Sequence, residues 1–378
     1  MVSTKKDPVL AVISLSGGND GLNTVIPYND PNYRDNRPAL GIPEDQIVHL
    51  TNEIGLHPSF APLKKYWDQG KLAIIQGVGY PHGSLSHFRS MDIWATCEPD
   101  TLGVEGWLGR VIKALDPTGE NVLTAVNFGR GMPRSLAMEG VPVASVGDLT
   151  SYGLLTDIEK ENEREEALDL FGRMYAPAIG KGAVNDFIRR TGIEAMKGAD
   201  ILGTAPAKYN SEIEYLLGNI GGYLKDMVQV HNAQFGTRVF FTTAPYNIFD
   251  THANQAVGHS NLLSDVAVNV DSYMSDLRQL DISDNVTTLL YSEFGRRAKD
   301  NGSGTDHGTG GVAFVIGENV KGGLYGEYPS LKDNELEDGG NLQHNTDFRS
   351  IYTTLLEKWM DLDAKPIVGG SYEKLGFL

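Results

Sequence analysis

Five short apolar runs recur along this chain, and glycine and polar residues cluster next to each of them. The runs are of strand length and lie at 9–15, 72–78, 239–243, 287–291 and 312–316. Helical patterning fills much of the remaining chain, at 57–69, 87–96, 158–175, 211–234, 261–280 and 346–361. Apolar strands that alternate with helices are typical of a mostly parallel sheet with helices on both faces. The sequence therefore predicts an α/β fold.

The chain of 378 residues is long enough for one large domain or for two. It contains no internal repeat and no segment with the composition of an interdomain linker. The stretch from about 150 to 235 separates the early strands from the late ones and has helical patterning. We expect residues 1–378 to form a single domain with a helical insertion at about 150–235.

Composition excludes several classes of protein. A formal net charge of −17 repels phosphate backbones, so we expect no nucleic-acid partner. No apolar stretch reaches the roughly 18 to 20 residues of a membrane span. The first residues lead directly into the first apolar run, so no export signal is visible. The localisation stays open: periplasmic or extracellular if an export signal has been removed, and otherwise cytoplasmic. Cys97 is the only cysteine, which excludes an internal disulfide.

Chemically reactive side chains lie at or just after the carboxyl ends of the predicted strands. They are Asp20, His82, Ser84, Ser86, His87, Asp250, His252, His259, Glu293, Asp306 and His307. In an open parallel sheet the strand ends face one crevice, where ligands bind. Carboxylates and imidazoles that converge there suit a metal such as Zn²⁺, Mn²⁺ or Fe²⁺. Asp250 and His252 fall on one side of an extended segment, and His307 can approach the same point from another strand.

Two serines, Ser84 and Ser86, precede the helix predicted at 87–96. Serine is common at the N-cap of a helix, so capping is one interpretation of this pattern. The other interpretation is a nucleophile at a helix N-terminus, where backbone N–H groups and the helix dipole favour an anion. The pattern alone leaves both open.

Several motifs together resemble the bacterial DUF1501 family, and the resemblance extends over nearly the whole chain. The motifs are Ser16-Gly17-Gly18-Asn19-Asp20-Gly21-Leu22-Asn23-Thr24, Ser86-His87-Phe88 with Asp92-Ile93-Trp94, Asp250-Thr251-His252, Ser292-Glu293-Phe294-Gly295-Arg296 and Thr346-Asp347-Phe348-Arg349. That family is placed in the alkaline phosphatase/sulfatase-like superfamily. The resemblance implies an alkaline phosphatase-like fold and the hydrolysis or transfer of phosphate or sulfate esters at a site of one or two metals.

The resemblance also implies roles for individual residues. Asp20 matches the Asp after the first strand, and Ser86 matches the nucleophile better than Ser84 does. Asp250 with His252 or His259 resembles an Asp–His pair that holds a metal, and His307, next to Asp306, resembles the final His ligand. Glu293 stands where the superfamily has Asp, and Phe294 where it has a His ligand. A second alignment instead matches Asp306-His307 to that Asp-His motif and His344 to the final His.

Because Phe294 replaces a His ligand of the superfamily, we expect one divalent metal (Zn, Mn, Fe or Ca) rather than two. We expect Ser86 to attack a small-molecule or saccharide ester, with His87 beside it and with Arg296 or Arg89 paired to the remaining ester oxygens. A degenerate member that binds an anion or a sugar without turnover is the alternative, and a metal-dependent isomerase or mutase is a third possibility.

Overall fold

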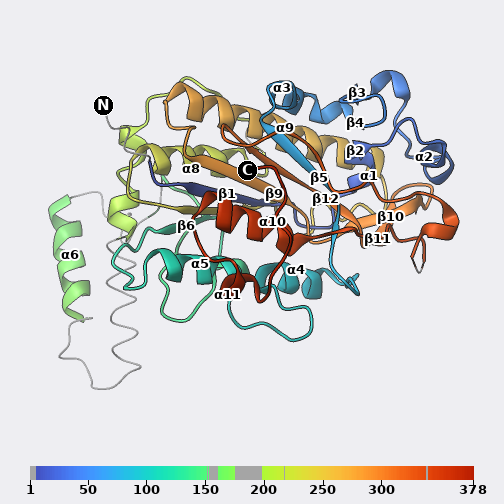
Figure 1. Ribbon diagram of the computed structural model, residues 1–378. Coiled ribbons are helices and arrows are strands. Elements are labelled where there is room, and N and C mark those ends of the chain that lie inside the picture. The colour runs from blue at the N-terminus through green and yellow to red at the C-terminus, as the bar shows by residue number, and fades with distance from the viewer. Residues whose placement is uncertain (1–5, 151, 153–160, 175–197, 217, 338) are drawn as a thin grey trace, which may run out of the picture.

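A mostly parallel sheet forms the centre of the computed structural model, which describes residues 6–150, 152, 161–174, 198–216, 218–337 and 339–378 (Figure 1). Its strands are β1 (Val9–Ser14), β5 (Leu72–Gly79), β6 (Ala125–Phe128), β7 (Ala144–Val146), β8 (Val239–Thr243), β9 (Val286–Tyr291), β12 (Gly311–Gly317), β13 (Gly323–Tyr325) and β14 (Thr346–Asp347). Their order is β13-β5-β12-β9-β1-β8-β6-β7, and β14 pairs with β5. Within this described sheet β12 alone is antiparallel to its neighbours, β5 and β9.

Helices cover both faces of the sheet (Figure 1). One face carries α8 (Gly221–Asn232) and α9 (Gln255–Gln279), and the other carries α4 (His87–Thr96), α5 (Trp107–Leu115), α10 (Phe348–Thr354) and α11 (Lys365–Val368). Strand β1 shows why both faces must be covered, since all six of its side chains are buried. Ile13 belongs to the apolar cluster of α8 and α9, and Val12 to that of α4 and α5. The predicted α/β fold class is confirmed.

Smaller elements complete the described part of the chain. Two small sheets are formed by β10 (Gly295–Asp300) with β11 (Thr305–Gly308), and by β2 (Val25–Ile26), β4 (Gly55–Leu56) and β3 (Val48–His49). Further α-helices are α1 (Gly21–Thr24), α2 (Pro31–Asn36), α3 (Lys64–Asp68) and α6 (Glu161–Met174). No helix in the described ranges combines the length and the apolar character that crossing a membrane requires.

The predicted elements agree with the structure more closely for strands than for helices. All five apolar runs are strands of the central sheet, and the helix predicted at 87–96 has those bounds. The helix predicted at 57–69 begins as a 3₁₀ helix (Pro58–Leu63), which contains Pro62, and only then becomes α3. The helix predicted at 211–234 is wrong in its first part, because α8 begins at Gly221. Much of the predicted insertion, 153–160 and 175–197, lies outside the described residues.

The topology brings four loops to one edge of the sheet. Strands β1, β8 and β9 are parallel, so the loops that follow them leave the sheet at the same edge. Strand β5 runs in the same direction, and the chain after it leads into the N-terminus of α4. Because β12 is reversed, the β10–β11 hairpin that precedes it arrives at this edge as well. The sequence predicted that His307 lies at or just after the end of a strand. In the structure His307 lies within β11.

Candidate metal centre

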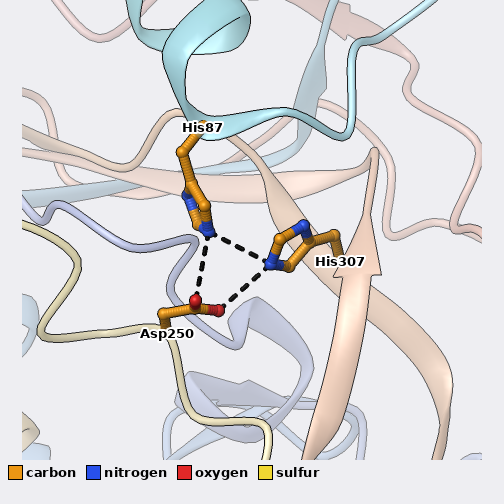
Figure 2. Close-up of side chains that lie close together, drawn as sticks. All are labelled: His87, Asp250 and His307. Atoms are coloured by element: carbon orange, nitrogen blue, oxygen red, sulfur yellow. Dashed lines mark hydrogen bonds and ion pairs between the residues drawn. The ribbon is translucent and has the colours of Figure 1, made fainter.

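Two histidines and an aspartate from three separate segments of the chain meet at this edge (Figure 2). His87 is the first residue of α4, Asp250 lies in the loop after β8, and His307 lies in β11. Their ligand-type atoms all fall within 4.8 Å of one another. The His87 and His307 Nε2 atoms are 3.1 Å apart, His307 Nε2 is 3.1 Å from Asp250 Oδ1, and His87 Nε2 is 3.4 Å from Asp250 Oδ2.

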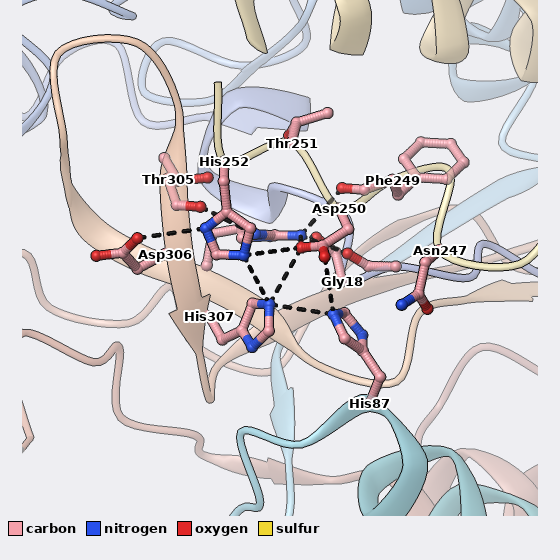
Figure 3. Close-up of polar contacts among 12 residues, drawn as sticks. Gly18, His87, Asn247, Phe249, Asp250, Thr251, His252, Thr305, Asp306 and His307 are labelled. Atoms are coloured by element: carbon pink, nitrogen blue, oxygen red, sulfur yellow. Dashed lines mark hydrogen bonds and ion pairs between the residues drawn. The ribbon is translucent and has the colours of Figure 1, made fainter. Parts of the chain in front are cut away.

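A third imidazole adjoins this group from its more exposed side (Figure 3). His252 Nε2 lies 3.0 Å from both His307 Nε2 and Asp250 Oδ1. The side chain of His252 is 44% exposed, whereas that of His87 is 9% exposed. We call His87, Asp250, His252 and His307 the metal group. The metal group is thus buried at His87 and open to solvent at His252.

The other ring nitrogen of each histidine is held by an oxygen. His87 Nδ1 lies 2.8 Å from Glu293 Oε1, His307 Nδ1 lies 2.8 Å from the Leu85 carbonyl, and His252 Nδ1 lies 3.3 Å from Asp306 Oδ1. Each of these oxygens accepts a hydrogen bond, so the proton of each neutral ring belongs on Nδ1. The three Nε2 atoms therefore present lone pairs to one another and to the Asp250 carboxylate.

Lone pairs at 3.0–3.4 Å repel one another unless a positive charge lies between them. One proton can bridge a single such contact, whereas one divalent cation can lie between His87, Asp250 and His307 at once. A tetrahedral ion bound at about 2.0–2.1 Å separates its ligand atoms by about 3.3 Å, which is close to the distances within the metal group. Imidazole nitrogens with one carboxylate suit Zn²⁺, Mn²⁺ or Fe²⁺, whereas Ca²⁺ prefers oxygen ligands. The residues present fit one ion of the first kind.

Arg296 fixes the position of Asp250 from behind. Its guanidinium donates to Asp250 Oδ1 at 2.8 Å and to the backbone carbonyls of Gly18 at 2.6 Å and Thr305 at 2.9 Å. Burial acts to raise the pKa of Asp250, but the hydrogen bond and the positive charge of Arg296 outweigh it and lower that pKa below its usual value. The Arg296 side chain is completely buried, so it holds the loops together and does not face a substrate.

Glu293 orients His87 and does not join the metal group. Its carboxylate accepts from the Gly17 backbone N–H at 2.9 Å, from Ser292 Oγ at 3.0 Å and from His87 Nδ1. A carboxylate in this position fixes the ring and makes the distant nitrogen more basic. Phe294 packs against the rings of His87 and His307, with centroids 4.7 and 4.9 Å away.

Asp20 and His259 form a separate network under the metal group. Arg37 donates to Asp20 Oδ2 at 2.5 Å and to Oδ1 at 2.9 Å, both side chains are completely buried, and Gln255 also bonds Asp20. His259 Nε2 lies 2.8 Å from Asn19 Oδ1, and burial lowers the pKa of His259 to about 3. The structure thus pairs Asp250 with His252 rather than with His259, and gives Asp20 a guanidinium as its cation.

Of the two candidate serines, Ser86 has the freer hydroxyl. Ser84 Oγ accepts from the Ser86 backbone N–H at 3.2 Å. Ser86 occupies the N-cap position of α4, but its side chain makes no capping bond and is exposed. It lies between Leu85, whose carbonyl bonds His307, and His87. The other catalytic candidate, Arg89, is bonded to Asp92 at 2.6 Å and to two backbone carbonyls.

Sequence reasoning placed His87 among the catalytic residues and did not assign it a ligand role. Its position directly after Ser86 suggested the neighbourhood of a nucleophile, and nothing local showed that its ring faces Asp250. The signal lay in the topology, since α4 begins at the same sheet edge as the loop after β8. His344, the other candidate for the final His, packs beside Gly79 and is not part of the metal group.

Comparison with known proteins gives a partial family match. Residues 226–369 match a family model described as a protein of unknown function (DUF1501). That range contains Asp250, His252, Glu293 and His307, but not the motifs around Asp20 and Ser86, which the sequence resemblance also covered. A search of curated proteins found no match.

Several solved structures are similar to this chain at low identity. Ps i-CgsB is 10% identical with a TM-score of 0.41, over 97% of this chain and 73% of that one. The zinc complex of the C-terminal periplasmic domain of EcEptC from Escherichia coli is 10% identical with a TM-score of 0.38, over 83% of this chain and 74% of that one. The lipoteichoic acid synthase LtaP from Listeria monocytogenes is 8% identical with a TM-score of 0.36, over 90% of this chain and 74% of that one.

Proposed function

We propose that this protein is a metal-dependent hydrolase of a phosphate or sulfate ester. The observation that carries the proposal is the metal group itself. Its three Nε2 atoms and one carboxylate lie close together, and the ring protons are on the Nδ1 atoms, so no proton is left to bridge each of these contacts. His87, Asp250 and His307 would hold one ion, and His252 stands ready on the exposed side. Such an ion, when bound, polarises an ester oxygen and favours the deprotonated form of a nearby nucleophile.

The residues around the metal group support this chemistry. Glu293 and the Leu85 carbonyl hold the two imidazoles in the tautomer that binds a metal, and Arg296 holds the Asp250 carboxylate. The N-terminus of α4 points its free backbone N–H groups toward the loop that carries Ser86, where an anionic ester group is favoured.

Ser86 is the proposed nucleophile. Its Oγ forms a bond to phosphorus or sulfur as the bond from that atom to the ester oxygen breaks, and the leaving alcohol takes up the proton that the serine loses. Water then cleaves the seryl ester, which restores the hydroxyl and releases phosphate or sulfate.

Metal content and activity test the proposal together. We expect one equivalent of Zn, Mn or Fe per chain by elemental mass spectrometry, and its loss in His307→Ala. The matched control is His82→Asn, which removes an exposed imidazole that lies outside the metal group. A folded protein that binds no metal and cannot be loaded would overturn the proposal.

Ser86→Ala tests the nucleophile separately from the metal. We expect this variant to keep its metal and to lose hydrolysis of methyl phosphate or methyl sulfate by at least about 10³-fold, as for removal of other activated nucleophiles. Full activity in Ser86→Ala would assign the attack to a different group and leave the metal-dependent hydrolase in place.

Two observations favour a second candidate, a protein that binds an ester without cleaving it. Phe294 covers the rings of His87 and His307, and Arg37 already neutralises Asp20. Both features leave room for a single metal ion. A reaction that needs two metal ions would then not take place. This candidate predicts that phosphate or sulfate raises the thermal stability of the metal-loaded protein while no ester is hydrolysed.

A further inference from the structure

We infer that Phe88, Tyr246 and Asn247 form a subsite that binds an uncharged sugar ring beside the metal group. The inference rests on the proposed function, because the ring would be the alcohol part of the ester. It concerns which ester is recognised, and the residues that carry it are outside the metal group.

An exposed aromatic pair flanks the metal group. The side chain of Phe88 is 77% exposed and that of Tyr246 is 58% exposed, and their ring centroids lie 6.1 Å apart at an angle of 40°. Phe88 directly follows His87 in α4, and Tyr246 lies on the loop that carries Asp250. A single exposed apolar side chain is ordinary, but two aromatic rings side by side at the edge of a polar site form a surface for a flat partner.

Asn247 supplies the polar part of the subsite. Its carbonyl accepts from the backbone N–H of Asp250 at 3.1 Å (Figure 3), and its Oδ1 atom is buried with no hydrogen-bond partner in the described part of the chain. Its backbone has a φ of 55°, a left-handed conformation that asparagine tolerates better than most residues. The bond from its backbone N–H to Ser16 Oγ, at 3.1 Å, holds it there. This amide oxygen thus lacks the hydrogen bond that a buried polar atom usually has.

The combination of these groups identifies the chemical class. Aromatic faces pack against the C–H face of a sugar ring, and an amide can both donate to and accept from its hydroxyls. An aryl group would use the rings but would leave the amide unpaired. A polyanionic sugar would need cationic partners, but of the described arginines Arg89 is bonded to Asp92 and Arg296 is buried. A neutral sugar that bears one ester therefore fits best.

Three non-hydrolysable ligands test the inference by binding rather than by turnover. They are methylphosphonate, phenylphosphonate and the 6-phosphonate analogue of glucose, titrated by calorimetry into the metal-loaded full chain. We expect the glucose ligand to bind most tightly and methylphosphonate least tightly. Phe88→Ala should weaken both ring ligands roughly 3- to 10-fold, as expected for the loss of one aromatic contact, and leave methylphosphonate unchanged.

Asn247→Gly separates the sugar from the aryl ligand, since glycine keeps the left-handed backbone while the amide is removed. It should weaken the glucose ligand alone, by roughly 3- to 10-fold for one lost hydrogen bond. Leu170→Ala, on the distant helix α6, is the matched control for an exposed apolar side chain and should change nothing.

The outcomes distinguish this inference from the proposed function. Equal affinity for all three ligands overturns the subsite and leaves the metal-dependent hydrolase intact. Tighter binding of phenylphosphonate than of the glucose ligand, with no effect of Asn247→Gly, overturns the assignment to a sugar. A metal-loaded protein that binds none of the three overturns both proposals.

Discussion

The metal group and the Asp20 network lie at the same sheet edge and use similar residues, yet they differ in what satisfies them. In the Asp20 network a buried guanidinium and an amide bond the carboxylate, and Asn19 bonds His259. In the metal group the outer nitrogens have partners, while the inner ones face only one another and a carboxylate. Similar side chains thus build a closed structural network in one place and an open binding site in the other.

Removing Arg37 should have the largest effect on stability. Arg37→Met leaves the Asp20 carboxylate buried without its cation, which costs about 3–5 kcal/mol of the free energy of unfolding. Urea denaturation measures the loss, and the metal content of the folded fraction should not change. The double variant Asp20→Leu/Arg37→Met should recover much of the stability. Equal losses in the single and double variants would show that burial of the unpaired charge is not the cause.

Neutralising Glu293 should act on the metal group instead. Glu293→Gln keeps an oxygen near His87 Nδ1 but removes the charge that makes the ring more basic. We expect metal affinity to fall about 10- to 100-fold, measured by competition with a chromogenic chelator. Unchanged affinity would mean that the Leu85 carbonyl and Asp250 suffice to position the ligands.

The Asp20 network should also give a distinct pH dependence. Because burial lowers the pKa of His259 to about 3 from 6.5, the unfolded chain binds a proton between these values that the folded chain does not. Stability therefore falls as pH falls through this window, by at most about 1.4 kcal/mol per pH unit for this group. His259→Gln should flatten the pH profile of the melting temperature of the metal-free protein. An unaltered profile would contradict the assignment.

The smallest effect is expected at Asp306, which bonds His252 Nδ1 at the exposed end of the metal group. Its side chain is 51% exposed, so its charge is screened by solvent. Asp306→Asn should change metal affinity less than Glu293→Gln does, corresponding to about 0–1 kcal/mol. A larger effect than that of Glu293→Gln would make His252, and not His87, the better-held ligand.

Sequence patterns predicted the strands well because the buried strands are marked by their own residues. Every side chain of β1, β5 and β9 is buried, so each reads as an apolar run. Short edge strands such as β13 and the β10–β11 hairpin lack that pattern, and they were missed. The early start of α9 was also missed, since Gln255 and His259 are polar residues buried by the Asp20 network.

The candidate site was predicted as a set of residues but not as an arrangement. Asp250, His252 and His307 were expected to meet, and the structure brings them together. Asp20, His259 and Glu293 were expected as ligands, and they lie in other roles at the same edge. Local sequence could not separate these groups, because the residues next to a carboxylate in the chain do not show whether it binds a metal or an arginine.

The sequence by itself determined the α/β fold class, the main strands and the pool of acidic and imidazole side chains at their ends. Only the tertiary structure decided which of them remain available to a ligand. Glu293 reaches His87 across 206 residues, and the Leu85 carbonyl reaches His307 across 222. These contacts fix which ring nitrogen carries the proton. The reason is physical: burial and apolar patterning are written along each strand, whereas hydrogen-bond partners are set by segments that meet only after folding.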